Sequence, residues 1–283
     1  MFQIIEIFRL IRVVNCLLAM VGVALGAWMT WFTPVYFGPV IAAVAAFLVC
    51  AAGNTVNDLR DMEVDRINRP DRVLVRGALS PALARNLAIG LNLLALVLAV
   101  CVSLWLAAVA LLTILLLLAY NLALKKVPVA GNLVVALLAG MTFLTGGLAV
   151  DPYLAFRLPG PLIPFAFAFF FHLVREIVKD VQDIEGDQKA GVTTLPQVIG
   201  VSPSLLVSLG LFAILTVLTC LPIFYGWYGE AYKVIAFYVV DLPLLALLIL
   251  IWGNPSRVML ATGSVALKLG MVLGLVALVL ARK

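Results

Sequence analysis

The feature that most constrains this chain is a series of nine long apolar runs. Each run is about 18 to 24 residues long, enough for a helix rising 1.5 Å per residue to cross a hydrocarbon core about 30 Å thick. Strands with open edges would leave backbone groups unpaired in lipid, and the runs lack the alternation of barrel strands, so helices are predicted. The runs cover residues 13–32, 35–57, 82–101, 103–120, 129–150, 161–178, 203–224, 232–252 and 258–281.

The overall composition agrees with a membrane protein. Of the 283 residues, 65% are apolar and 12% are charged, and the mean hydropathy is +1.18, which excludes a soluble domain of this length. We therefore predict an all-α, polytopic membrane protein with nine transmembrane helices around a central cavity, built as one domain over residues 1–283. The run that starts near Val13 is long enough to be a first span, so no cleavable signal is expected.

The distribution of basic residues predicts the orientation. With a cytoplasmic N-terminus, fourteen of the nineteen Lys and Arg residues lie on the inside, and only Arg157, Lys233, Arg282 and Lys283 lie outside. Because most basic residues occupy short loops between apolar runs, the net charge of +5 indicates membrane topology and not nucleic-acid binding. We expect a multi-pass protein of the cell membrane, surrounded by membrane lipids, with its site facing the cytoplasm.

The densest group of charges ends the second apolar run, where residues 54–76 read NTVNDLRDMEVDRINRPDRVLVR. At 100° per residue, one helical face carries an amide and three carboxylates, with a second amide on its flank. These residues are Asn54, Asp58, Asp61 and Asp65, with Asn57 on the flank. Such closely spaced carboxylates repel one another unless a cation lies among them, and their oxygen atoms suit Mg²⁺. The arginines that follow, including Arg69 and Arg72, suit a phosphate-bearing ligand.

A second acidic group ends the sixth run. Asp180, Asp183 and Asp187 repeat the spacing of the first triplet, three residues and then four. We expect each triplet to line one helical face, although Gly186 can end the second helix early. Only about 14 and 13 apolar residues precede the two groups, which predicts a water-accessible cavity at that depth. Two such faces on one side of the membrane would hold Mg²⁺ ions and a diphosphate between them.

The alternative without a functional site is that both groups are solvated loop charges beside membrane helices. Ten of the fourteen acidic residues lie in these two segments, on the same predicted side and with matched spacing. This clustering favours a site over chance loop charges.

Further polar residues lie at the cytoplasmic ends of other runs. Arg12 and Asn15 begin the first run, and Tyr120, Lys125 and Lys126 follow the fourth. Interfacial Tyr and Lys are also routine membrane anchors, so both interpretations stay open for these residues.

The remaining polar residues inside the runs favour structural roles. His172 follows a Phe-rich stretch and is expected to be a hydrogen-bonded packing residue, while the phenylalanines fit either a lipid-facing surface or the wall of an isoprenoid channel. Asp241 and Lys268 fall within the last two runs and are predicted to pair with each other, because an unpaired charge there is costly. The four cysteines are expected to be small buried side chains: Cys16, Cys50, Cys101 and Cys220.

The two acidic segments resemble the signatures of the UbiA superfamily of intramembrane prenyltransferases. The first resembles N-D-x-x-D-x-x-x-D and is followed by the N-R-P of residues 68–70, and the second resembles D-x-x-D-x-x-G-D, with G-x-x-T-L-P at residues 191–196. One departure is visible, because relatives often read R-P-L-P where this chain has Arg72 followed by Val73, Leu74 and Val75. This departure bears on the stiffness of the loop and not on the metal site.

The resemblance implies Mg²⁺-dependent transfer of a prenyl group from a polyprenyl diphosphate to an acceptor. It implies metal binding by Asn54, Asn57, Asp58, Asp61, Asp65, Asp180, Asp183 and Asp187, of which Asp61, Asp65, Asp183 and Asp187 are assigned to catalysis. It implies diphosphate binding by Arg69, Arg72, Tyr120, Lys125, Lys126 and Lys179, and acceptor binding by Arg12 and Asn15.

Within the superfamily, the R-x-x-N-C-x-x-A opening and the R-E-I-V-K-D-x-x-D-x-E-G-D stretch are most similar to archaeal members that add a geranylgeranyl group to geranylgeranylglyceryl phosphate. The resemblance therefore implies geranylgeranyl diphosphate as donor and a lipid phosphate as acceptor. The alternative acceptor is aromatic, such as 4-hydroxybenzoate or a related quinone precursor. A divalent-cation transporter is less favoured, because the acidic residues gather at the cytoplasmic ends and not in a line across the bilayer.

Overall fold

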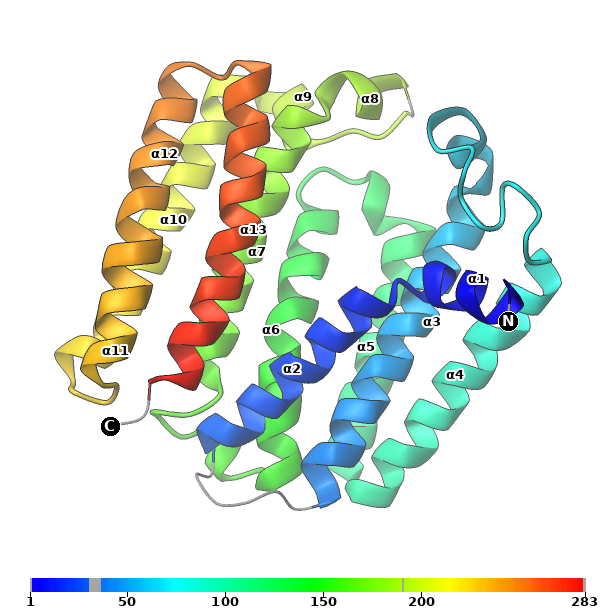
Figure 1. Cartoon of the computed structure of the whole chain (residues 1–283), viewed down its shortest axis with the longest axis horizontal. Helices are drawn as coiled ribbons and strands as arrows, with labels where there is room; N and C mark the ends of the chain where they lie inside the picture. Colours follow the sequence, from blue (N-terminus) through cyan, green and yellow to red (C-terminus); the bar gives the residue numbers. More distant parts are fainter. Residues whose placement is uncertain (1, 31–36, 190, 282–283) are drawn as a thin grey trace. The chain divides into compact units, whose positions relative to one another are not determined.

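All regular elements of the computed structural model are helices, over the residues it describes, 2–30, 37–189 and 191–281 (Figure 1). The longer helices are α2 (Val13–Thr30), α3 (Phe37–Asn68), α4 (Pro81–Val102), α5 (Leu104–Leu122), α6 (Ala130–Val150), α7 (Leu162–Gln182), α10 (Val201–Phe224), α12 (Leu242–Gly253) and α13 (Arg257–Val279). The shorter elements are α1 (Phe2–Ile11), η1 (Leu124–Lys126), η2 (Leu154–Phe156), α8 (Ile184–Lys189), α9 (Leu195–Ile199), α11 (Glu230–Tyr232) and the π-helical η3 (Lys233–Asp241). The all-α prediction is confirmed for the described residues.

Eight helices of the described chain are long and apolar enough to cross a membrane. The sixth predicted run forms α7, which is not among the eight and carries Arg175, Glu176 and Lys179 towards its end. The count of nine spans, the orientation and the single domain stay predictions, and Arg282 and Lys283 lie outside the described residues. The outer faces of α4 and α5 expose large apolar side chains such as Leu93, Val97 and Trp105, as lipid-facing helices do.

The helices group into two units, and α6 contributes residues to both. The first unit comprises the described residues of Met1–Leu124 and Met141–Pro161. Within it, α3 packs along α2, α4 and α5. The close approach of α6 to α2 depends on glycine. A Cβ on Gly26 of α2 would lie 1.9 Å from the Phe143 carbonyl oxygen of α6, and a Cβ on Gly146 of α6 would lie 1.9 Å from the Val23 carbonyl oxygen of α2. Small residues at such crossings are typical of membrane helices, which lack a hydrophobic driving force towards one another.

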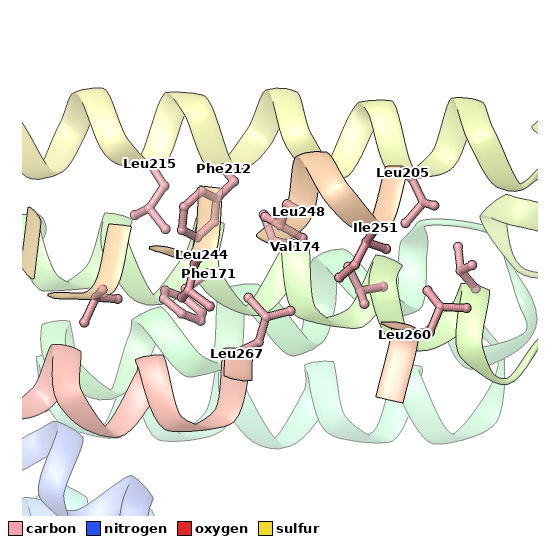
Figure 2. Packing of buried hydrophobic residues seen from close by; sticks show 13 residues of the cluster. Phe171, Val174, Leu205, Phe212, Leu215, Leu244, Leu248, Ile251, Leu260 and Leu267 are labelled. Atoms are coloured by element: carbon pink, nitrogen blue, oxygen red, sulfur yellow. The ribbon is translucent and has the colours of Figure 1, made fainter. Parts of the chain in front are cut away.

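The second unit comprises residues 125–140 and the described part of 162–283, with α7 packed against α10 and α13. Its core is a cluster of interlocking apolar side chains contributed by α7, α10, η3, α12 and α13 (Figure 2). Phe171 of the Phe-rich stretch packs edge-on against Phe212, with ring centroids 6.0 Å apart. Phe171 therefore belongs to the protein core, and neither interpretation offered from the sequence, lipid-facing surface or channel wall, applies to it.

The segment that precedes the first apolar run also folds, as the short helix α1. Leu10 of α1 is fully buried in a cluster with Val73, Leu74 and Leu79 from the segment after α3. Glu6 is only 1% exposed, and it pairs with Arg9 of its own helix and with Arg76. This helix was not predicted, and its available signal was a mostly apolar segment with a single acidic residue, Glu6.

Three expectations about residues inside the runs are corrected by the structure. Asp241 is buried and Lys268 is exposed, and no ion pair joins them in the described chain, so the predicted pairing is wrong. The Nδ1 atom of His172 is buried and has no hydrogen-bond partner among the described residues, so the expected bond is absent at that atom. Cys16 is buried as expected, whereas Cys101 is exposed.

Candidate active site

The first acidic segment forms the end of one continuous helix. Helix α3 runs without a break from Phe37 to Asn68, so its amides and carboxylates follow the predicted helical spacing. The helix has 32 residues, about 48 Å at 1.5 Å per residue, which leaves its polar end extending past the length needed to cross a hydrocarbon core. The prediction that the first triplet shares one helical face is confirmed.

Asp58 is a buried carboxylate of this segment that pairs with two arginines. It is 4% exposed, and its Oδ1 atom accepts hydrogen bonds from Arg12 Nη2 at 2.5 Å and from Arg72 Nη1 at 2.8 Å. Arg72 Nη1 also reaches Oδ2 at 3.0 Å. Two guanidinium groups, 46 residues before and 14 residues after Asp58 in the chain, therefore converge on one buried carboxylate.

The other members of the segment have different partners. The side-chain amide of Asn57 donates to Asp61 Oδ2 at 3.1 Å, so an amide and a carboxylate lie side by side one turn apart. Asp65 is buried, at 8% exposure. The amide of Asn54 donates to the backbone carbonyl oxygen of Ile11 at 2.8 Å and so ties α3 to the end of α1.

The chain after α3 turns tightly and presents Arg69 and Arg72. The Arg69 amide donates to the Asp65 carbonyl oxygen at 2.8 Å, and the Arg72 amide donates to the Arg69 carbonyl oxygen at 3.0 Å. Val73 and Val75 stand where the signature that this segment resembles has proline, and Val73 and Leu74 are buried. Apolar burial therefore helps to fix this loop.

Arg12 lies at the junction between α1 and α2. Its φ angle is 54°, in the left-handed region that residues other than glycine seldom adopt. Such a conformation persists only where surrounding contacts hold it, and the ion pair with Asp58 is one such contact. Asn15 follows one turn later and is exposed.

The second acidic segment is interrupted. Helix α7 ends at Gln182, Asp183 forms the turn, and α8 begins at Ile184. Backbone hydrogen bonds from Asp183 to Lys179 and from Asp187 to Asp183 bridge the turn at 2.9 and 3.0 Å. The break lies three residues before Gly186, the residue that was expected to end the helix, and Gly186 itself lies inside α8. The members of this triplet therefore belong to two helices and the turn between them, and not to one continuous helix, while their sharing of one face stays a prediction.

Asp180 is held by Asn132, a residue that was not among the predicted site residues. The side-chain amide of Asn132, near the start of α6, donates to Asp180 Oδ2 at 2.7 Å, and both residues belong to the second unit. The available signal was a lone amide at the start of an otherwise apolar run, because polar residues at membrane depth usually have a partner.

Asp187 and Lys179 are two further predicted site residues of the second segment. Partial burial raises the pKa of the Asp187 carboxyl above its usual value, and the Asp183 carboxylate raises it further, while Lys179 and Lys125 oppose the rise. Lys179 is exposed and lies 3.7 Å from Glu176. The two lysines therefore reduce the rise in the pKa of Asp187 without cancelling it.

The other predicted site residues lie at the junction of α5 and α6. Tyr120 is half-buried in the last turns of α5, and Lys125 and Lys126 form η1, where Lys125 is half-buried and Lys126 exposed. Val129, three residues before Asn132, has a φ of 66°, a costly conformation for a β-branched residue. The chain therefore turns sharply between the lysine pair and Asn132.

The oxygen donors of each acidic segment are of the kind that Mg²⁺ prefers. Mg²⁺ takes oxygen ligands and is usually held by one or two carboxylates together with waters and substrate phosphates. Among the described residues no group of three or more His, Cys, Asp or Glu side chains is placed to enclose a metal ion alone. Asp61, whose Oδ2 atom accepts a hydrogen bond from the Asn57 side-chain amide, is therefore suited to be one of the few carboxylate ligands that a metal shared with a diphosphate requires.

Comparisons with known proteins agree with the family resemblance found in the sequence. The chain is 37% identical to the digeranylgeranylglyceryl phosphate synthase of Methanopyrus kandleri, over 95% of this chain and 96% of that protein. A solved structure from work on digeranylgeranylglyceryl phosphate synthase in membranes is 30% identical, covers 99% of both chains and has a TM-score of 0.84. The fold is also that of a UbiA homologue from Archaeoglobus fulgidus bound to GPP and Mg²⁺, which is 20% identical over 97% of this chain and 99% of the other, with a TM-score of 0.66.

The family is shown by the chain as a whole. Residues 15–262 match the UbiA prenyltransferase family, a range that contains both acidic segments and all but one of the predicted site residues. Only Arg12 lies before the matched range. This chain belongs to the UbiA prenyltransferase family and is a polytopic membrane enzyme.

Proposed function

We propose that this enzyme transfers a geranylgeranyl group from geranylgeranyl diphosphate to a glycerol hydroxyl of geranylgeranylglyceryl phosphate. The observation that carries the proposal is the 37% identity to a digeranylgeranylglyceryl phosphate synthase across 95% of the chain. The solved structure that is 30% identical over 99% of the chain adds support. The reaction forms an ether bond of an archaeal membrane lipid.

The two acidic segments are proposed to bind the prenyl diphosphate through Mg²⁺. The carboxylates assigned to catalysis are Asp61 and Asp65 from α3, and Asp183 and Asp187 around the α7–α8 turn. When bound, Mg²⁺ neutralises the negative charge that develops on the leaving diphosphate.

Basic side chains assist the departure of the diphosphate. Arg72, Lys125 and Lys179 add positive charge where the leaving group gathers negative charge, and Arg69, Lys126 and Tyr120 are assigned to the same diphosphate. The bond between the prenyl carbon and the diphosphate oxygen breaks, and its electron pair leaves with the diphosphate. The acceptor oxygen then bonds to the allylic carbon, and its proton passes to the released diphosphate.

The acceptor is assigned to the junction of α1 and α2. Arg12 and Asn15 lie one turn apart there, and a guanidinium is suited to the phosphate of a lipid acceptor. The apolar surroundings of a membrane site keep water from the allylic cation, which water would otherwise quench. We place this site on the cytoplasmic side of the cell membrane, where the basic loops are predicted to lie.

The decisive experiment offers the purified protein two acceptors in parallel. Protein in detergent receives Mg²⁺ and geranylgeranyl diphosphate with either geranylgeranylglyceryl phosphate or 4-hydroxybenzoate, and products are identified by mass spectrometry. We expect product from the lipid phosphate alone, and product only from 4-hydroxybenzoate would contradict the assignment. Chelation with EDTA is expected to abolish turnover, and added Mg²⁺ to restore it.

A further inference from the structure

Asp58 is a buried carboxylate on which two arginines converge. Both of its oxygens accept hydrogen bonds from guanidinium groups, at 2.5, 2.8 and 3.0 Å. Asp61, one turn later on the same helix, accepts a hydrogen bond from the side-chain amide of Asn57.

The pairing makes Asp58 a weak ligand for a cation. One carboxylate and two guanidinium groups carry a net charge of +1, and a divalent ion brought to this cluster meets two positive charges within hydrogen-bond distance of the oxygens it needs. Breaking either ion pair to free an oxygen would leave a guanidinium without its partner at a carboxylate that is 4% exposed, which is costly.

The same geometry leaves both guanidinium groups able to bind an anion. Each arginine uses one terminal nitrogen for Asp58, and a guanidinium has five N–H donors in a fixed fork. The described residues accept no other hydrogen bond from either side chain. The side chains of Arg12 and Arg72 are 30% and 21% exposed, so the remaining donors are within reach of a ligand.

We propose that Asp58 is a positioning residue and not a Mg²⁺ ligand: it holds Arg12 and Arg72 together as one phosphate-binding pair. The proposal rests on the proposed function and deepens it, because it joins the arginine assigned to the acceptor and the arginine assigned to the diphosphate through one buried carboxylate. The ligand chemistry is a phosphoryl group, supplied by the prenyl diphosphate or by the phosphate of the lipid acceptor.

The test compares Asp58→Asn with Asp61→Asn, two equal changes one turn apart on α3. For Asp58→Asn we expect the KM of at least one phosphate substrate to rise 10-fold or more, while the Mg²⁺ concentration for half-maximal rate stays within 2-fold of the unaltered enzyme. For Asp61→Asn we expect that Mg²⁺ concentration to rise 10-fold or more. The proposal is overturned if Asp58→Asn shifts the Mg²⁺ requirement as Asp61→Asn does, or leaves both KM values unchanged.

Separate titrations identify the source of the phosphoryl group. A rise in the KM of geranylgeranyl diphosphate alone assigns the pair to the donor, and a rise in that of geranylgeranylglyceryl phosphate alone assigns it to the acceptor. Binding of geranylgeranylglyceryl phosphate to the full-length protein in EDTA, measured calorimetrically, gives a readout without turnover. A 10-fold weaker binding by Asp58→Asn supports the acceptor, and unchanged binding restricts the pair to the donor.

A background without the arginines tests whether Asp58 acts through them. In the Arg12→Gln/Arg72→Gln double variant, adding Asp58→Asn should change neither KM by more than 2-fold, because the groups that it positions are gone. A further 10-fold loss would show that Asp58 contacts substrate or metal directly. If Asp58→Asn alone does not elute as a folded species, the triple variant, which carries no charge at these three positions, is compared with the unaltered enzyme. A KM raised 10-fold or more at an unchanged Mg²⁺ requirement supports the proposal, and a raised Mg²⁺ requirement overturns it.

Failure of the proposed function is recognised separately. If the unaltered protein makes no product from either acceptor, the calorimetric binding of inorganic pyrophosphate at varied Mg²⁺ still compares the two aspartates. Asp58→Asn must then keep the Mg²⁺ dependence of binding and weaken pyrophosphate affinity. The reverse pattern overturns the role given to Asp58.

Discussion

The two acidic segments share one spacing but not one structure. Asp58, Asp61 and Asp65 lie on the last turns of the unbroken helix α3, whereas the second triplet is divided among α7, a turn at Asp183 and α8. Their partners differ as well. Two arginines saturate Asp58, and an amide, that of Asn132, holds Asp180.

This difference shows what a sequence signature fixes and what it leaves open. The repeat of three and four residues places carboxylates near one another in any helical conformation. Whether a given carboxylate binds metal or serves as a counter-ion depends on side chains distant in sequence, such as Arg12, which is 46 residues from Asp58. Members of one motif can therefore have different chemical roles.

The largest expected effect is common to both segments. Asp61→Asn and Asp183→Asn should each lower Mg²⁺-dependent turnover about 1,000-fold, because each removes a carboxylate charge from the metal and diphosphate site. The matched controls are Asp71→Asn and Glu185→Gln, which alter exposed residues of the same two segments and should cost less than 3-fold. The rate of product formation at saturating substrates measures the effect. Unequal losses in Asp61→Asn and Asp183→Asn would show that the two segments do not contribute equally to turnover.

Next in size is an effect confined to the second segment. Asn132→Ala removes the hydrogen bond to Asp180 and should raise the Mg²⁺ concentration for half-maximal rate about 10-fold, the lower end of the range for losing a group that orients a metal-binding residue. Asn121→Ala is the control, because the side-chain amide of Asn121 donates to the Leu117 carbonyl oxygen of its own helix. An unchanged Mg²⁺ requirement in Asn132→Ala would show that the Asn132–Asp180 hydrogen bond does not contribute to Mg²⁺ binding.

The third prediction concerns the stability of the first unit and compares the two ion-pair partners of Glu6. Glu6→Gln weakens a buried charge-assisted contact with Arg76 and should lower the free energy of unfolding by roughly 1.5–3 kcal/mol. Arg9→Gln removes only the exposed partner of Glu6 and should cost less than about 1 kcal/mol. Thermal unfolding in detergent distinguishes the two, and equal losses would show that the Arg76 contact adds nothing.

The smallest effect tests the break in the second segment. Gly186 lies inside α8, and a Cβ at this position has no neighbour within 4 Å. Gly186→Ala should therefore raise the free energy of unfolding by about 0.5–1 kcal/mol through the better helix propensity of alanine. A loss of stability would indicate that Gly186 is required for the conformation of the turn and not merely tolerated in the helix.

The polar interior residues show where sequence reasoning stopped. The nine apolar runs located the long helices, and the first acidic helix, the family and the enzyme class were all predicted before any contact was known. The pairing of Asp241 with Lys268 failed because two charges in adjacent runs need not face each other, and here one is buried while the other is exposed. Asn132 was missed because a single polar residue in an apolar run gives no indication of its partner, and Glu6 was missed because it lies before the first apolar run.

By itself, the sequence determined that this chain crosses a membrane as helices and carries two carboxylate groups of matched spacing, because hydropathy and helical periodicity are local properties. Only the tertiary structure decided that α7 breaks at Asp183, that Asn132 bonds to Asp180, and that Arg12 and Arg72 share Asp58. The physical reason is that an ion pair or hydrogen bond forms between groups that packing brings within about 3 Å of each other, however far apart they lie along the chain.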